Sequence, residues 1–198
     1  MKKGKTFIIS GPSGVGKSTV LKALLDKRKD LYFSISATTR PPRPGEIDGV
    51  HYHFLDVDTF RKWIADDDFL EYAEYVGNFY GTPKKFVDIA MNRGQDVILD
   101  IEVQGAIQVC SKRPDTVRVF IAPPSWSELE RRLTERGTDT PEKVQKRLLR
   151  AKVEFQTAHT YDYFVINDTV EEAVRELDAI ITAEHCKPKE RMEILNSR

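Results

Sequence analysis

The chain has 198 residues, of which 40% are hydrophobic and 31% charged, a balance typical of a globular protein with one substantial core. Its 31 basic and 31 acidic residues cancel, so net charge gives no reason to expect nucleic acid as a partner. The two cysteines are too few for a disulfide framework, and the apolar run Phe7 to Ile9 is too short for an export signal or a membrane span. We therefore expect a cytoplasmic protein that binds neither nucleic acid nor membrane.

A buried strand from Thr6 to Ser10 and a helix from Lys17 to about Lys29 are expected first along the chain. Between them, residues 11–18 match the phosphate-binding pattern G-x-x-x-x-G-K-[ST] in its required strand, loop and helix context. The glycines let backbone N–H groups point into one concavity, and the helix start adds its positive dipole end. This predicts a polyphosphate site in which Lys17 reaches the β- and γ-phosphates and the Ser18 hydroxyl supplies an oxygen to Mg²⁺. An ordinary glycine-rich turn is the alternative.

A small insertion is predicted next. A second strand, Leu31 to Ser36, leads into the run 37–45, where three prolines forbid a helix. From Glu46 to Thr82, aromatic residues alternate with turn signals, which favours a β-rich subdomain with one short helix from Val57 to Ala65.

Helices and strands alternate over the rest of the chain. Expected helices run from Lys84 to Arg93, Trp126 to Arg136, Pro141 (capped by Thr140) to about His159, and Val170 to Glu184; expected strands are Asp96 to Asp100, Val117 to Ile121 and Tyr163 to Ile166. This alternation predicts a parallel sheet with right-handed crossovers and helices on both faces. Such sheets bind ligands beyond the carboxyl ends of their strands, and four residues follow predicted strands there: Gly11, Ser36, Asp100 and Asn167.

Asp100 closes an apolar strand, where phosphate-loop enzymes keep a second carboxylate that orients magnesium. Its coexistence with the phosphate loop predicts that it acts through a metal-bound water. An aspartate that simply ends a strand is the alternative.

Arginines stand out in two further segments. Arg40 and Arg43 lie in a proline-stiffened run, and their guanidinium groups can grip a phosphate bidentately. Arg132, Arg136 and Arg147 flank a break between two helices, and on a lid they would neutralise charge on the phosphoryl group in flight. For both groups the alternative is a solvated surface, which is the default for arginines. In the second group, Glu128 precedes Arg132 by four residues and Glu135 neighbours Arg136, which favours that alternative.

Glu71 lies inside the aromatic-rich insertion. A carboxylate accepts two hydrogen bonds from adjacent donors, such as N1–H and N2–H₂ of guanine, whereas adenine brings an acceptor to the same point. Thr82 can donate its hydroxyl to guanine O6, and the hydroxyls of Tyr52 and Tyr80 can bind phosphate. Each signal is weak alone, because aromatic residues in an insertion usually form its core.

With these residues in place, the sequence closely resembles guanylate kinase. The matching blocks run in family order from about Thr6 to Glu184. They are residues 10–19, Ser36 with Thr38 to Arg40, Pro42 with Arg43, Gly49 with Tyr52, residues 69–71, 77–82, 98–105 and 120–125, Arg132 and Leu133 with 136–138, and residues 165–168.

The resemblance implies an α/β fold: a P-loop kinase core (1–36, 83–123 and 151–198) with a parallel five-stranded sheet flanked by helices, a β-rich GMP-binding insertion (37–82) and a helical lid (124–150). It implies direct in-line transfer of the γ-phosphoryl group of ATP to GMP, and also to dGMP, with Mg²⁺, in purine nucleotide metabolism. A monomer or a homodimer would carry out this reaction.

The resemblance also implies sets of site residues by position. The ATP-binding set is Gly11, Pro12, Ser13, Gly14, Val15, Gly16, Lys17, Ser18, Thr19 and Asn167, the last near adenine. The GMP-binding set is Ser36, Arg40, Arg43, Tyr52 and Tyr80 at the phosphate, Glu71 and Thr82 at guanine with Glu102 assisting, and Asp100. The catalytic set is Lys17, Arg40, Arg43, Arg132, Arg136 and Arg147, and the metal set is Ser18 and Asp100.

Two departures and two rival functions bear on this prediction. Thr82 stands where some members have Ser, and Glu102 where some have Asp, and both keep the functional group. A silent guanylate-kinase-like module that binds peptides would be expected to lack the phosphate loop and lid arginines. A phosphate-loop kinase for a sugar phosphate would be expected to lack the guanine-reading pair.

Overall fold

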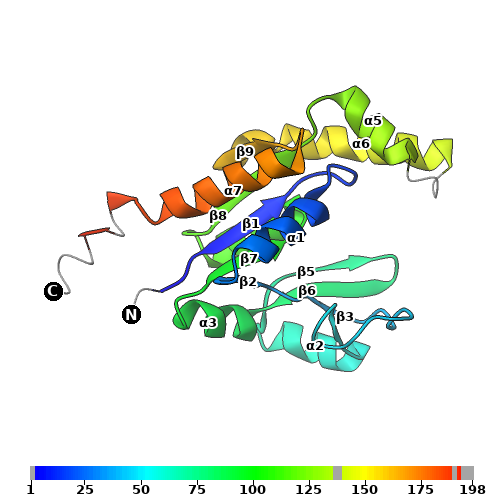
Figure 1. The fold of residues 1–198 in the computed structure, drawn as a ribbon. Helices are drawn as coiled ribbons and strands as arrows, with labels where there is room; N and C mark the ends of the chain where they lie inside the picture. The colour runs from blue at the N-terminus through cyan, green and yellow to red at the C-terminus, as the bar shows by residue number, and fades with distance from the viewer. Residues whose placement is uncertain (1–2, 136–139, 189–190, 193–198) are drawn as a thin grey trace. The chain divides into compact units, whose positions relative to one another are not determined.

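Short apolar runs form the main sheet of the computed structural model, with five strands in the order β2-β7-β1-β8-β9 (Figure 1). The strands are β1 (Thr6–Ser10), β2 (Leu31–Phe33), β7 (Asp96–Asp100), β8 (Val117–Ala122) and β9 (Tyr163–Ile166). Strand β7 pairs in parallel with β1 and β2, and β9 pairs in parallel with β8. Every residue of β1 is buried, as expected for a parallel strand covered on both faces. The predicted five-stranded parallel sheet is confirmed.

The structure describes residues 3–135, 140–188 and 191–192. The chain divides into two compact units: residues 1–10 with 29–118, and residues 11–28 with 119–198.

The first unit contains a second sheet, with strands in the order β4-β3-β6-β5. Its strands are β3 (Ala37–Thr38), β4 (His53–Phe54), β5 (Phe69–Tyr75) and β6 (Asn78–Pro83), and the unit's helices are α2 (Val57–Ala65), α3 (Lys84–Asn92) and α4 (Val103–Lys112). Phe60 on α2 stacks on Phe69 of β5 with ring centroids 4.4 Å apart, and Ala37 completes this small core. The expected β-rich insertion with one short helix is confirmed.

The hairpin β5–β6 fixes which residues face each other across the second sheet. Its turn lies at Val76 and Gly77, both with positive φ, as primed hairpin turns require. The antiparallel register then sets Glu71 opposite Thr82. Two residues eleven positions apart in the sequence thus form a cross-strand pair.

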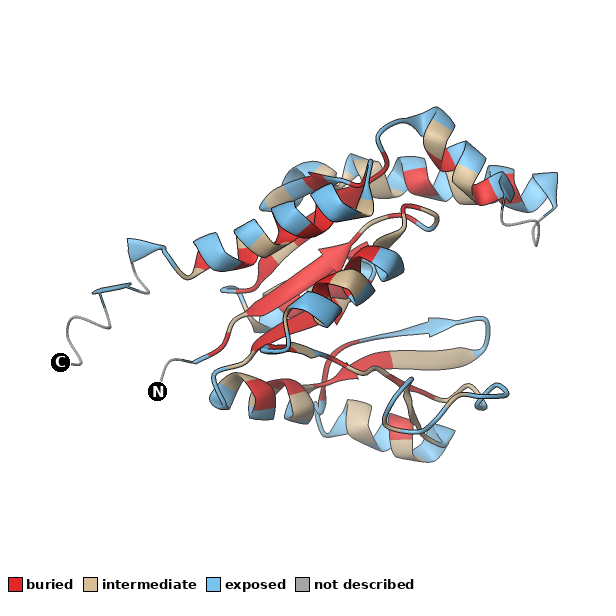
Figure 2. Ribbon diagram, in the orientation of Figure 1, coloured by how far each residue is buried: buried red, intermediate tan, exposed pale blue. Residues whose placement is uncertain are grey.

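The second unit carries four α-helices among its described residues: α1 (Lys17–Lys27), α5 (Trp126–Glu135), α6 (Pro141–Gln156) and α7 (Val170–Glu184). The inner face of α1 buries Val20, Leu21 and Leu24, as the apolar spacing predicts. Figure 2 shows the same division on α7, with buried residues along one side and exposed residues along the other. Lys27 and Arg28 both form ion pairs with Asp178 of α7, which ties the two helices together.

Some element boundaries differ from the sequence-based expectations. Strand β2 ends at Phe33 rather than at Ser36. The reason is that residues 37–38 pair with β6 and β4, so the intervening residues leave the main sheet to reach the second one. The helix that begins at Pro141 ends at Gln156 and is followed by a 3₁₀ turn, Ala158–Thr160.

Helix α4 was not among the expected elements. It begins after Glu102, whose side chain makes no capping bond, and it contains Gly105, a poor helix former. Local signals for this helix are therefore weak, although it buries Val103, Ala106 and Val109. Tertiary burial stabilises a helix that propensity does not predict.

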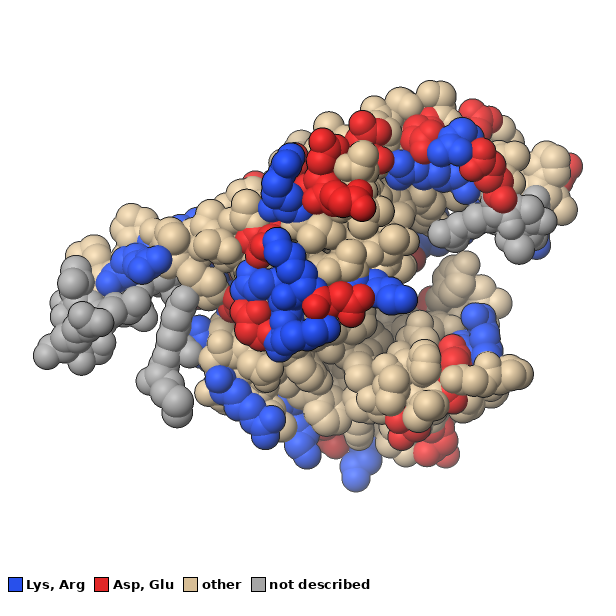
Figure 3. Space-filling model, viewed as in Figure 1, with Lys and Arg blue, Asp and Glu red and all other residues tan. Residues whose placement is uncertain are grey.

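In the face drawn in Figure 3, basic and acidic side chains are interspersed. Within the described ranges, no helix has the length and apolar character needed to cross a membrane. Anion binding is therefore expected at local groups of cations.

Candidate active site

The phosphate loop ends at Gly16, which caps α1 in the left-handed region with φ 86°. A Cβ atom at this position would lie 2.5 Å from Nδ2 of Asn167, far inside contact distance. Both the backbone conformation and the neighbour therefore require glycine here. The loop runs directly into the start of α1, as the phosphate-binding pattern requires, and the anion site there stays a prediction.

Asn167 follows β9, and its side chain is hydrogen-bonded to the phosphate loop. Its Nδ2 donates to the carbonyl oxygen of Val15 at 2.6 Å, and only 3% of the residue is exposed. Its Oδ1 is buried and has no hydrogen-bond partner among the described residues. Because buried acceptors are normally satisfied, this oxygen is available to a donor on a ligand.

Two arginines of the predicted lid contact the loop. Arg132 donates from Nη1 to the Val15 carbonyl at 3.3 Å and from Nη2 to the Asn167 carbonyl at 3.1 Å. Arg147 donates from Nη2 to the Ser13 hydroxyl at 2.5 Å. Both cations therefore lie at the loop that would carry a polyphosphate.

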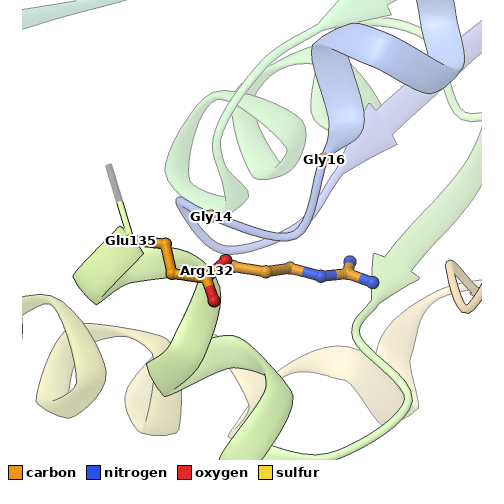
Figure 4. Close-up of a pocket in the computed structure, with 4 residues that line it drawn as sticks. All are labelled: Gly14, Gly16, Arg132 and Glu135. Carbon is orange, nitrogen blue, oxygen red and sulfur yellow. The ribbon is translucent and has the colours of Figure 1, made fainter. Parts of the chain in front are cut away.

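An open pocket of about 320 Å³ adjoins the loop and is lined by Gly14, Gly16, Arg132 and Glu135. Figure 4 shows the Arg132 side chain extending from α5 alongside the loop. Its Nε donates to Glu128 at 2.6 Å, one turn earlier on the helix. Hydrogen bonds from Arg131 and then Arg132 lower the pKa of Glu128 to about 2, so this carboxylate stays ionised at neutral pH.

The first unit gathers a second group of anion-binding donors. Arg40 Nη2 pairs with Glu46 Oε1 at 2.8 Å, and the Arg43 backbone N–H donates to Glu46 Oε2 at 2.7 Å. The hydrogen bond from Arg40, followed by that from Arg43, lowers the pKa of Glu46. Arg40 also lies over the ring of Tyr52 at 5.4 Å, and the rings of Tyr52 and Tyr80 meet edge to face at 6.2 Å. The side chains of Arg40, Tyr52 and Tyr80 thus lie together, and Glu46 binds the Arg40 guanidinium and the Arg43 backbone N–H.

The predicted guanine readers form a buried pair. Thr82 donates its hydroxyl to Glu71 Oε1 at 2.6 Å, and Glu71 is 7% exposed. Burial raises the pKa of Glu71, and repulsion from Glu102 adds to the rise, while the bonds from Thr82 oppose it. In the same unit, burial raises the pKa of Tyr52, with a smaller contribution from the charge of Asp100.

The comparisons with known proteins point to one family. A sequence profile described as Guanylate kinase matches residues 3–184. The chain is 56% identical over 182 residues to a guanylate kinase of Thermus thermophilus, covering 92% of this chain and 82% of that protein. It is 51% identical over 185 residues to one of Clostridium perfringens, covering 93% and 86%. The chain belongs to the guanylate kinase family.

A solved guanylate kinase shares the fold. The crystal structure of guanylate kinase from Anaplasma phagocytophilum has a TM-score of 0.78 and 32% sequence identity to this chain, and it covers 100% of this chain and 96% of that one. The resemblance drawn from the sequence motifs and the expected fold class are thereby confirmed.

Not every predicted site residue makes a described side-chain contact within the site. Ser18 and Thr19 are exposed on the first turn of α1, where Lys17 begins the helix. The backbone carbonyl of Ser36 accepts from the N–H of His53 in β4, and its role at the GMP phosphate stays a prediction. Arg136 lies outside the described residues. The metal-binding role of Ser18 and Asp100 stays a prediction.

Sequence reasoning missed the roles of two acidic residues in this chain. In the sequence Glu46 marks only the start of the aromatic-rich segment, yet its carboxylate binds the Arg40 guanidinium and the Arg43 backbone N–H. Glu128 was evidence for a solvated arginine face, yet it pairs with Arg132 while that arginine still reaches Val15. Its spacing of four residues before Arg132 is the signal that indicates the pairing.

Proposed function

We propose that the ATP-dependent phosphorylation of GMP, which membership of the guanylate kinase family supports, proceeds here by direct in-line transfer of the γ-phosphoryl group. The observation that carries the choice of acceptor is the buried pair of Glu71 and Thr82. It is a carboxylate and a hydroxyl inside a subdomain whose neighbouring arginines and tyrosines suit a phosphate. A nucleoside monophosphate with donors on its base fits this combination.

Guanine would use both groups of the pair. Its N1–H and N2–H₂ would donate to the Glu71 carboxylate, and its O6 would accept from Thr82. The Thr82 hydroxyl has one proton, which it gives to Glu71 in this structure, so it would turn toward O6 when guanine binds. Adenine would face the carboxylate with an acceptor, and each buried group left unpaired costs about 1–3 kcal/mol.

The GMP phosphate would take the place of an internal anion. Glu46 now binds the guanidinium of Arg40 and the backbone N–H of Arg43. A phosphate presents more oxygens and more charge to the same donors, with the hydroxyls of Tyr52 and Tyr80 beside them. Ser36 would add a further donor by its position in the family pattern.

On the donor side, the loop N–H groups and Lys17 would hold the β- and γ-phosphates, and Asn167 Oδ1 would accept from the adenine amino group. Arg132 and Arg147 would exchange their contacts with Val15 and Ser13 for oxygens of the transferring group. No side chain needs to act as a covalent nucleophile, because positioning and electrostatics carry phosphoryl transfer.

The oxygen ligands of Ser18 and Asp100 suit the Mg²⁺ that accompanies ATP. Magnesium favours hydroxyl, carboxylate and phosphate oxygens and keeps several waters, so it needs few protein ligands. Among the described residues, no group of three or more His, Cys, Asp or Glu side chains is placed to hold a metal. When bound, the ion neutralises charge on the β- and γ-phosphate oxygens.

A coupled assay of ADP formation tests the function. We expect turnover that depends on GMP, slower or equal turnover with dGMP, and almost none with AMP. Absence of GMP-dependent turnover, or equal turnover with AMP, would sink the assignment. Inhibition of GMP turnover by ribose phosphates at similar concentrations would favour the rival sugar-phosphate kinase.

We also predict that Glu128→Gln lowers kcat about 10-fold and leaves the KM for GMP unchanged. The substitution keeps the shape of the side chain but replaces a charged hydrogen-bond acceptor of Arg132 Nε by a neutral one. Steady-state kinetics with saturating ATP measure the effect. The matched control is Glu154→Gln, which alters a pair of the same spacing with Arg150 on α6. An equal loss in both variants would contradict a specific role for Glu128.

A further inference from the structure

Gly105 lies in the first turn of α4 and is buried against the side chain of Glu71. A Cβ atom at Gly105 would meet three atoms of that side chain first: Oε2 at 2.8 Å, Cδ at 3.2 Å and Cγ at 3.3 Å. The backbone does not demand glycine, because Gly105 is absent from the described residues with positive φ. Glycine is also a poor helix former. The neighbouring carboxylate is therefore what the missing side chain accommodates.

Helix α4 is bonded to β5 by two side chains that follow Gly105, and the strand residues that they bind lie on either side of Glu71. The Gln108 side chain accepts from the Tyr72 N–H at 3.2 Å and donates to the Tyr72 carbonyl at 3.0 Å. Lys112 donates from Nζ to the Phe69 carbonyl at 2.7 Å. Gly105, Gln108 and Lys112 are spaced by three and four residues, so they share one face of the helix. The helix cannot move away from Glu71 without breaking these bonds.

The carboxylate is held on its other side as well. Its Oε1 accepts the Thr82 hydroxyl at 2.6 Å, and the Glu71 side chain is buried. An added methyl group at Gly105 would push Oε2 and Cδ, and this displacement would disturb the bond to Thr82. The Glu71 carboxylate and the Thr82 hydroxyl, which are proposed to read guanine, would then both be displaced.

We propose that Gly105 is a positioning residue for guanine recognition: by having no side chain, it leaves the space in which the Glu71 carboxylate takes its reading orientation. This inference rests on the proposed function of Glu71. Gly105 touches no substrate in this role and acts only through Glu71. Selectivity for guanine thus depends on a glycine of α4, a helix separate from the two strands that carry Glu71 and Thr82.

Gly105→Ala tests the proposal. We expect kcat/KM for GMP to fall by roughly 10²-fold, the order of loss that follows a misplacement of about 1 Å, and the preference for GMP over AMP to fall with it. The KM for ATP should not change. Ile107→Ala is the matched control, since Ile107 lies on the same helix and is 60% exposed, and it should leave all of these values unchanged. Unchanged GMP kinetics in a folded Gly105→Ala variant would overturn the proposal.

Thermal unfolding in two backgrounds separates the contact from the function. In a Glu71→Ala background the clash is gone, so Gly105→Ala should raise the Tm by about 2–4 °C through helix propensity and have no further effect on GMP kinetics. In the parent background that gain should be absent or reversed. Equal Tm shifts in both backgrounds would overturn the contact, even if Gly105→Ala unfolds too readily for assay. Lack of GMP turnover by the parent chain would instead refute the proposed function.

Discussion

Glu71→Gln is expected to lower kcat/KM for GMP by about 10⁴-fold, the size of discrimination found when a site built to hydrogen-bond its substrate loses that pairing. Gln presents an NH₂ donor where guanine presents donors of its own, so one hydrogen bond is lost and two donors face each other. The side chain is buried, so water cannot replace the lost partner. ADP formation over a range of GMP concentrations measures the loss, and ATP binding should be unaffected.

The control for this variant lies on the same strand. Glu74 is exposed, faces Phe79 across β5–β6, and differs from Glu71 by an odd number of positions, so its side chain points to the other face of the sheet. Glu74→Gln should leave GMP kinetics unchanged. Similar losses in both variants would show that the effect comes from the net charge of the hairpin and not from base reading.

The raised pKa of Glu71 adds a pH signature. Protonation removes an acceptor, so kcat/KM for GMP should fall on the acid side with a midpoint above the ordinary value of 4.5, and Glu71→Gln should lack this limb. The folded state binds this proton more tightly than the unfolded state, so ionisation of Glu71 lowers the stability of the protein as pH rises from 4.5 through the raised pKa. The Tm of Glu71→Gln relative to the parent should therefore increase across that window.

Arg132→Met should lower kcat by about 10³-fold, which is the lower end of the effect of an arginine that stabilises a transferring phosphoryl group. The KM for GMP should change little, because Arg132 contacts the phosphate loop at Val15 and not the GMP-binding set. Single-turnover rates with saturating ATP and GMP measure the chemical step directly.

Its neighbour provides the control. Arg131 bonds Glu128 and Glu135 on the same helix, and its side chain is 54% exposed. Arg131→Met removes the same charge from the adjacent position and should leave kcat within about twofold, as expected for a surface ion pair. A comparable fall of kcat in both variants would mean that the total charge of α5 matters and that Arg132 has no specific role in phosphoryl transfer.

Much of the fold could be predicted from the sequence because the residues that determine these elements lie close together along the chain. The phosphate loop, the buried strand before it and the helix after it are contiguous, so one pattern specifies all three. The pairing of Glu71 with Thr82 joins two residues of one hairpin that are only eleven positions apart. The register that makes them neighbours follows from a short turn at Val76 and Gly77.

The remaining features depend on long-range packing that no local pattern contains. Arg132 and Val15 are 117 positions apart, and the sequence offered a solvated face and a lid as alternatives for that arginine. The structure shows that ion pairing with Glu128 and contact with the loop occur together. Gly105 belongs to the matching block 98–105, but no local pattern indicates its role, because the atoms for which it makes room belong to Glu71 on another element.

The Val15 carbonyl has a consequence for how the second unit responds to nucleotide. A carbonyl oxygen has two lone pairs, and here Asn167 and Arg132 each donate to it. A ligand that draws Arg132 away would leave Asn167 as the one side chain, among the described residues, that donates to that oxygen, so the state of α5 and the rigidity of the loop are thermodynamically linked. By reciprocity, a substitution that makes the loop less rigid would make it easier for a ligand to draw Arg132 away from the Val15 carbonyl. Substitutions at positions 132 and 167 should accordingly be non-additive, with one oxygen atom as the point of coupling.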